Sequence, residues 1–175
     1  MKSVSIQQKE LLNNFTKVTG ELIQVLSEFS QLQLNSVPFD GSWTPGQVGD
    51  HLSKVYNVSE TLTGKVTDTS RDPELNNAGI SSTFLNFEIK MESPEFVLPT
   101  AETIHKQELI ASLEEKITRI ANVIQTHDLT KTCLDFELPM VGTLTRSEWI
   151  NFVIVHTKRH LHQLNNIKSY FIEQS

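Results

Sequence analysis

Apolar residues recur every three or four positions in four segments of the chain. These segments span about residues 6–34, 45–64, 107–125 and 145–173. The spacing places apolar side chains along one face of a helix, which can then be buried against neighbouring helices. The first segment shows the pattern most fully, at Leu11, Phe15, Val18, Leu22, Val25, Leu26 and Phe29. The sequence therefore predicts an all-α chain with four long amphipathic helices.

Two of these segments open with residues that begin helices. Thr44 and Gln47 have the spacing of a capping box, and Pro45 takes the first helical position. Thr145 and Glu148 repeat the capping-box spacing at the start of the last segment. We therefore expect the second and fourth helices to begin at these residues.

The connection between the second and third helices is long. It covers residues 65–106, whereas most connections in compact domains have only a few residues. Antiparallel neighbours need a short loop, but parallel neighbours need a chain that travels back along a whole helix. We predict a four-helix bundle in up-down-down-up order, with one long crossover between helices 2 and 3, forming a single domain over residues 1–175. Residues 82–91 are expected to form a short helix in the crossover, and residues 138–144 an extended segment or a hairpin.

Composition and charge narrow the classes of protein. The chain is 38% hydrophobic and long enough to bury a core, which excludes a disordered chain. A net charge of −6, with scattered Lys and Arg, argues against nucleic acid or an anionic membrane as partner. No apolar run has the length of a membrane span or the form of a signal peptide, so we expect a cytoplasmic protein. The single cysteine, Cys133, cannot form an internal disulfide and is expected to be a small, partly buried residue.

The last segment carries the first candidate ligands. His156 and His160 are four residues apart, so a helix places both rings on one face. At 100° per residue, this face also holds Trp149 and Phe152, whereas His162 falls on the polar side and is excluded. Two histidines at this spacing can bind one metal ion but leave its coordination incomplete.

His51 is the candidate for the third ligand, because it lies in the middle of the apolar stripe of the second helix. A buried imidazole is costly unless its nitrogens have partners. A metal ion supplies a partner for one nitrogen of each ring, and a backbone or side-chain oxygen would hold the other. The alternative is that each histidine is a core residue with an ordinary hydrogen bond. Asp50 points about 100° away from His51 on the helix, so we do not expect it to be a ligand.

Two motifs in the chain resemble those of a known family. Residues 43–52, with Trp43, Thr44, Gln47 and His51, resemble the W-[ST]-x-x-[EQ]-x-x-x-H-[LI] segment of the DinB superfamily. The closing segment resembles that of the same family in Gly142, Thr143, Leu144, Thr145, Glu148, Trp149, His156, His160 and Gln163. The resemblance covers essentially the whole chain, with helices in matching order.

This resemblance implies a four-helix bundle that is often a homodimer. It also implies a divalent metal ion on three histidines, which would be His51, His156 and His160 here. The ion is commonly nickel or zinc, with iron and manganese as alternatives. Family members with known activity include thiol transferases and a thiol-dependent isomerase, and the resemblance implies no binding to DNA.

The sequence leaves three functions open. The first is a metal-dependent enzyme, a hydrolase or a thiol transferase, acting on a small-molecule substrate such as a low-molecular-weight thiol. The second is a bundle that binds a small molecule or a partner without chemistry, with the histidines as polar core residues. The third is a purely structural dimer. In the enzyme, Trp149, Phe152 and residues of the crossover would line the pocket, and we find no inward carboxylate to move protons.

Overall fold

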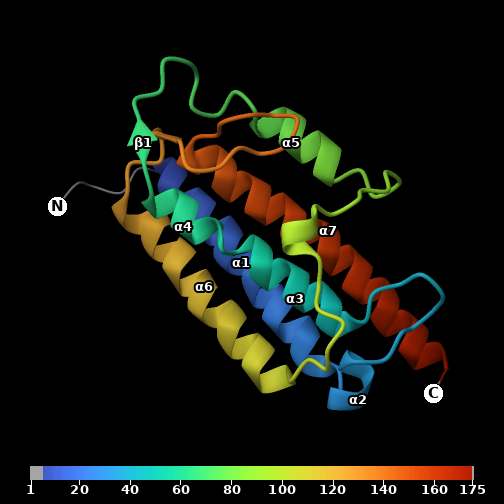
Figure 1. Cartoon of the computed structure of the whole chain (residues 1–175). Helices are drawn as coiled ribbons and strands as arrows, with labels where there is room; N and C mark the ends of the chain where they lie inside the picture. Colours follow the sequence, from blue (N-terminus) through green and yellow to red (C-terminus); the bar gives the residue numbers. More distant parts are fainter. Residues whose placement is uncertain (1–5, 175) are drawn as a thin grey trace.

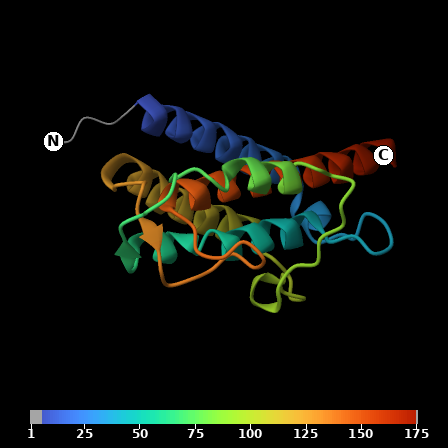
Figure 2. The ribbon, with the colours of Figure 1, turned by 90° about the horizontal axis from the view of Figure 1, so that it is seen from above.

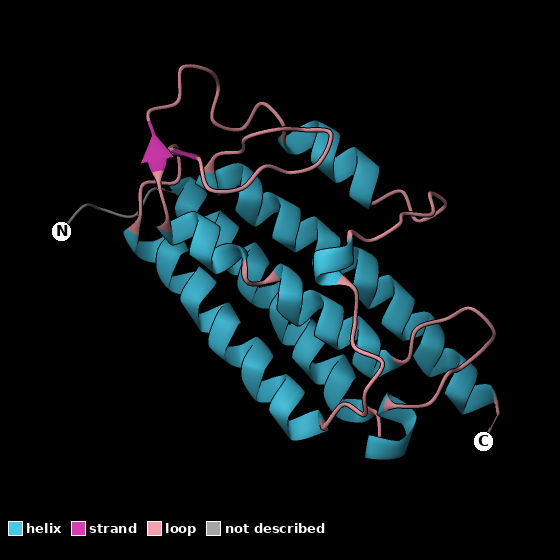
Figure 3. Ribbon diagram, in the orientation of Figure 1, coloured by secondary structure: helices cyan, strands magenta, loops and turns pink. Residues whose placement is uncertain are grey.

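The computed structural model describes residues 6–174, and helices dominate it (Figure 3). Four long rods form the bundle, and one of them is built from two consecutive helices. The rods are α1 (Ile6–Glu28), α3 (Pro45–Val55) continued by α4 (Val58–Thr63), α6 (Lys106–Thr126) and α7 (Arg146–Glu173). The predicted all-α four-helix bundle is therefore confirmed. A single domain over residues 1–175 stays a prediction, and residues 1–5 and 175 lie outside the described part.

The helices run in the predicted up-down-down-up order. α1 and α7 point one way along the bundle, whereas the α3–α4 rod and α6 point the other way (Figures 1 and 2). The α3–α4 rod packs against its parallel neighbour α6 and also contacts α7. The crossover therefore has to return along the bundle from the end of α4 to the start of α6, which is the physical reason for its length.

The crossover contains two short helical pieces. They are α5 (Asn77–Phe84), which packs against α7, and the 3₁₀ turn η1 (Glu95–Val97). The short helix expected over residues 82–91 is thus placed wrongly, because the helix ends at Phe84. Residues 138–144 form the hairpin that was one of the two options, with a bridge between Leu138 and Gly142. A small antiparallel pair that the sequence did not predict joins β1 (Val66–Thr67) to β2 (Thr132–Cys133).

Two predicted helices are interrupted. The helix expected over residues 6–34 stops at Glu28, and α2 (Gln31–Leu34) follows it. Ser30 caps α2 through a full capping box with Gln33, so a new helix begins at this point. In the second rod the break falls at Tyr56. The backbone N–H groups of Asn57, Ser59 and Glu60 there donate to carbonyl oxygens three residues earlier instead of four, as in a 3₁₀ turn. No glycine or proline marks this second break.

The capping boxes predicted at Thr44 and Thr145 are both present. The second box is buried, because Glu148 has no exposed surface. Its carboxylate accepts 2.7 Å hydrogen bonds from both terminal nitrogens of Arg71, and 2.9 Å bonds from the backbone N–H groups of Thr145 and Asn76. This charged pair fixes the start of α7 against the crossover, and α7 carries two of the candidate ligands.

The core runs the length of the bundle between the rods. Its largest fully buried side chains are Phe15, Leu22, Leu26, Leu34, Leu52, Tyr56, Leu62, Leu113, Ile120, Ile124, Leu144 and Trp149. No helix within residues 6–174 combines the length and apolar character that crossing a membrane requires.

Candidate metal centre

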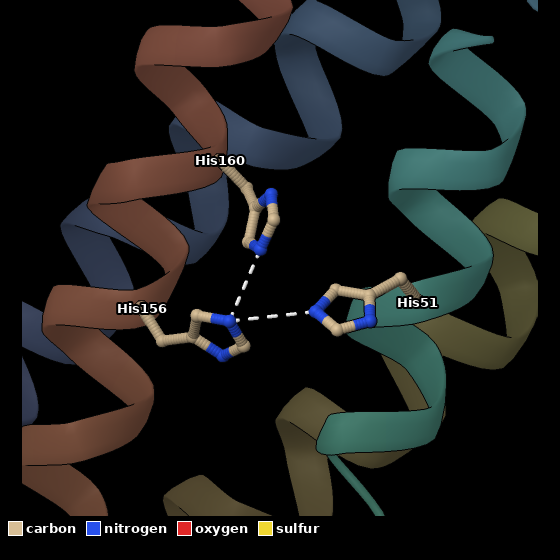
Figure 4. A group of neighbouring side chains, drawn as sticks. All are labelled: His51, His156 and His160. Carbon is tan, nitrogen blue, oxygen red and sulfur yellow. Dashed lines mark hydrogen bonds between the residues drawn. The ribbon is translucent and has the colours of Figure 1, made fainter. Parts of the chain in front are cut away.

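Three histidines from two helices meet inside the bundle. His51 projects from α3, and His156 and His160 project from α7 (Figure 4). The Nε2 atom of His156 lies 3.0 Å from Nε2 of His160 and 3.4 Å from Nε2 of His51. One ring nitrogen from each residue lies within 4.8 Å of the others, and this group contains no carboxylate or thiol. The structure therefore brings together all three residues that the sequence proposed.

The outer nitrogens of two rings are held by oxygen atoms. His51 Nδ1 lies 2.8 Å from the carbonyl oxygen of Val97, and His160 Nδ1 lies 2.8 Å from Oε1 of Gln163. An oxygen accepts, so Nδ1 of each ring donates and Nε2 keeps a lone pair. Both lone pairs face the interior of the group. The expected oxygen partners are thus confirmed for two rings, whereas Nδ1 of His156 is buried without a partner.

Burial keeps these imidazoles neutral. It lowers the pKa of His160 to about 3 and the pKa of His156 well below its ordinary value, with repulsion from the neighbouring histidines adding to both. Burial also lowers the pKa of His51, against a raising effect of the Val97 carbonyl. Neutral imidazoles are the form that binds metal ions. The residues therefore fit a divalent cation, because the Nε2 lone pairs of His51 and His160 are directed toward Nε2 of His156.

Aromatic rings enclose the group. The Trp43 ring lies 5.2 Å from the His51 ring and stacks on the His160 ring at 6.4 Å, both measured between ring centroids. Phe152 stacks on His156 at 5.1 Å, and Phe84 meets the same ring edge-on at 5.4 Å. Each of the three histidines is at most 8% exposed. The site is thus shielded from water in this structure, which strengthens any electrostatic interaction inside it.

The structure revises the expected pocket residues. Trp43, which the sequence offered only as part of the motif at residues 43–52, packs against the rings of His51 and His160. Trp149 packs against Phe152 and Phe136, one layer behind the histidines. Phe84 and the carbonyl of Val97 were not identified individually, because a backbone carbonyl has no sequence signature and the path of the crossover depends on long-range packing.

The crossover reaches the site as residues 97–100, which lie along α3. Positions 47, 50, 51 and 54 share one face of a helix. Each of these side chains bonds a backbone group of the crossover, in the pairs Gln47–Thr100, Asp50–Thr100, His51–Val97 and Lys54–Leu98. Asp50 lies outside the group of three histidines, and its carboxylate accepts the Thr100 N–H at 2.8 Å. His51 is one member of a polar row that fixes the crossover to α3.

Two residues that the sequence set aside stay outside the site. His162 lies on the exposed side of α7, where it stacks on Phe87 and contacts Asn166. Cys133 is fully buried rather than partly buried, and burial raises the pKa of its thiol to about 11. Since the thiolate is the reactive form, burial and the raised pKa both lower the reactivity of this thiol at neutral pH.

Comparison with known proteins agrees with the fold. YuaE of Bacillus subtilis, described as uncharacterized, is 25% identical over 159 residues, which are 88% of this chain and 94% of YuaE. The structure of Bacillus subtilis YfiT, described as a probable metal-dependent hydrolase with an unusual four-helix bundle topology, is similar with a TM-score of 0.59 and 18% identity. That similarity covers 97% of this chain and 90% of YfiT. The family model of the DinB superfamily matches residues 14–164. The chain therefore belongs to the DinB superfamily.

Proposed function

We propose that this protein is a metal-dependent hydrolase that holds one divalent ion on His51, His156 and His160. The observation that carries the proposal is the convergence of three Nε2 atoms from neutral, buried imidazoles. The description of YfiT as a probable metal-dependent hydrolase supports the same reaction class for a protein of this fold.

The donor set favours a catalytic role over a structural one. Structural zinc sites are usually closed by four protein ligands, whereas catalytic sites have three and keep a position open. The group of ligand atoms here holds three, all of them imidazole nitrogens. Imidazole suits zinc and nickel, which we propose as the ion, and also iron; manganese prefers oxygen ligands. A divalent ion in such a site lowers the pKa of a coordinated water and polarises a substrate.

The chain itself supplies orientation and exclusion of water. The Val97 carbonyl and Gln163 fix two rings, while Trp43, Phe84 and Phe152 form apolar walls. We propose a small-molecule substrate, because the histidines lie inside the bundle and not on an open face. Its entry requires Trp43 or Phe84 to move, since the rings are almost fully covered.

Metal content tests the first half of this proposal. We expect about one divalent ion per chain in protein purified without a nickel column. The His51→Asn, His160→Asn double variant should lose it, and His162→Asn, which removes a histidine from the exposed side of the same helix, should retain it. A wild-type protein that binds none of zinc, nickel, iron or manganese, or a double variant that still binds one ion, refutes the site.

Activity tests the second half. Wild-type protein should hydrolyse members of a panel of ester, amide and phosphoester substrates. The activity should disappear with a chelator and return with metal. Transfer of a low-molecular-weight thiol to an electrophile, without hydrolysis, would replace the hydrolase by the thiol transferase. A metal-loaded protein inactive in both assays would support the binding protein instead.

A further inference from the structure

One side chain holds the outer nitrogen of a candidate ligand. Gln163 lies three residues after His160 on α7, and its Oε1 atom is 2.8 Å from Nδ1 of that ring. Since an amide oxygen only accepts, the Nδ1 hydrogen of His160 lies on this bond. The lone pair of His160 Nε2 is then directed at the centre of the group, 3.0 Å from His156 Nε2.

The three rings are held in different ways. A backbone carbonyl, that of Val97, does for His51 what Gln163 does for His160. Nδ1 of His156 has no partner. Within residues 6–174, Gln163 is thus the one side chain that contacts an Nδ1 atom of the three histidines. Substitution of Gln163 removes this contact and leaves all three candidate ligands in place.

We propose that Gln163 is a positioning residue for the metal centre, which fixes the tautomer and the ring orientation of His160. This inference rests on the proposed function, because it assumes that the three histidines bind a divalent ion. Without the amide oxygen, either nitrogen of His160 can carry the proton and the ring can turn about its χ2 torsion. Both changes take the Nε2 lone pair away from the ion. Outer partners of ligating histidines typically change metal affinity by about 10–100-fold.

The chain offers a matched control on the same helix. Asn166 lies four residues after His162, and its side-chain amide contacts that ring: Nδ2 is 3.3 Å from Nε2 of His162. This pair is exposed and outside the group. Asn166→Leu and Gln163→Leu therefore each remove an amide that contacts an imidazole, but only the second contact belongs to the proposed metal centre.

Metal affinity is the readout, measured as the Kd for Zn²⁺ and for Co²⁺ in competition with a chromophoric chelator. We expect Gln163→Leu to raise the Kd by about 10–100-fold and to change the visible spectrum of bound Co²⁺. Asn166→Leu should leave both unchanged. Gln163→Glu should keep or tighten wild-type affinity, because a carboxylate is a stronger acceptor and raises the basicity of the ring. Urea unfolding of the metal-free proteins checks that each variant folds.

The outcomes separate this inference from the proposed function. If wild-type protein binds zinc but Gln163→Leu binds it equally well, Gln163 only satisfies a buried ring nitrogen and the inference is overturned, while the three-histidine site stands. If wild-type protein binds neither of these ions, and also none of nickel, iron or manganese, both proposals fail. Should Gln163→Leu not fold, Gln163→Glu decides, and a Kd above that of wild type overturns the positioning role.

Discussion

Two glycine substitutions in helices should change stability in opposite directions. Gly20 lies on the exposed side of α1, and a Cβ atom built there meets no heavy atom within 4 Å. Gly46 lies in the first turn of α3. A Cβ there would lie 2.8 Å from the carbonyl oxygen of Leu34, 3.2 Å from Cγ of the same residue and 3.3 Å from Cβ of Ile104. Cβ contacts under 3.0 Å essentially never occur, and the closest atom is backbone, so the start of α3 has to move.

The magnitudes follow from two effects. Alanine is favoured over glycine in a helix by about 1 kcal/mol, so Gly20→Ala should stabilise the protein by about 0.5–1 kcal/mol. Gly46→Ala gains at most the same amount and loses about 1–3 kcal/mol to overpacking. The free energies of unfolding of the two variants should then differ by about 1–3 kcal/mol, because the helix-propensity gain of alanine over glycine is similar in both and cancels.

Urea unfolding in the presence of a chelator measures both free energies of unfolding. The slope of the unfolding free energy against urea concentration (the m-value) should be the same in the two variants, since neither change alters the surface exposed on unfolding. Equal stability of Gly46→Ala and Gly20→Ala would refute the reasoning, because it would mean that α3 moves away from α2 at no cost. A Gly20→Ala protein less stable than wild type would refute the propensity argument.

Three further predictions concern the buried polar groups. Tyr56→Phe should cost about 1 kcal/mol of unfolding free energy, because the Tyr56 hydroxyl donates at 2.7 Å to Oγ1 of Thr157, whose own proton is used within α7; a neutral result in urea unfolding would contradict this. Glu148→Ala should cost about 3 kcal/mol, since it leaves Arg71 without its carboxylate, and thermal unfolding that matches wild type would contradict it. Metal-free protein should lose stability as the pH falls below about 6.5. In the unfolded chain His160 takes up a proton near that pH, whereas in the folded protein burial lowers its pKa to about 3 and keeps it neutral. The unfolded state therefore binds more protons and is favoured as the pH falls. The loss should be smaller in His160→Asn, and an equal loss in urea titrations at several pH values would contradict the assignment.

Local interactions account for what the sequence predicted correctly. The limits of α7 follow from its apolar period and from the Thr145–Glu148 capping box, and both are properties of neighbouring residues. The inward direction of His51, His156 and His160 follows from the geometry of a helix in the same way. The sequence missed the break at Tyr56, because no glycine or proline marks it and Asn57, the first residue after it, makes no side-chain capping hydrogen bond.

Tertiary structure decided how the site is assembled. His51 and His156 are 105 positions apart, and their nitrogens meet because α3 and α7 pack together. The Val97 carbonyl reaches His51 only through the course of the crossover, which the sequence could show to be long but could not place. Phe84 covers His156 because α5 packs on α7. The sequence by itself determined the helices and the face on which each histidine lies, since these depend on residues a turn apart. The distances between the rings and the partners of their outer nitrogens depend on long-range packing, which only the folded chain fixes.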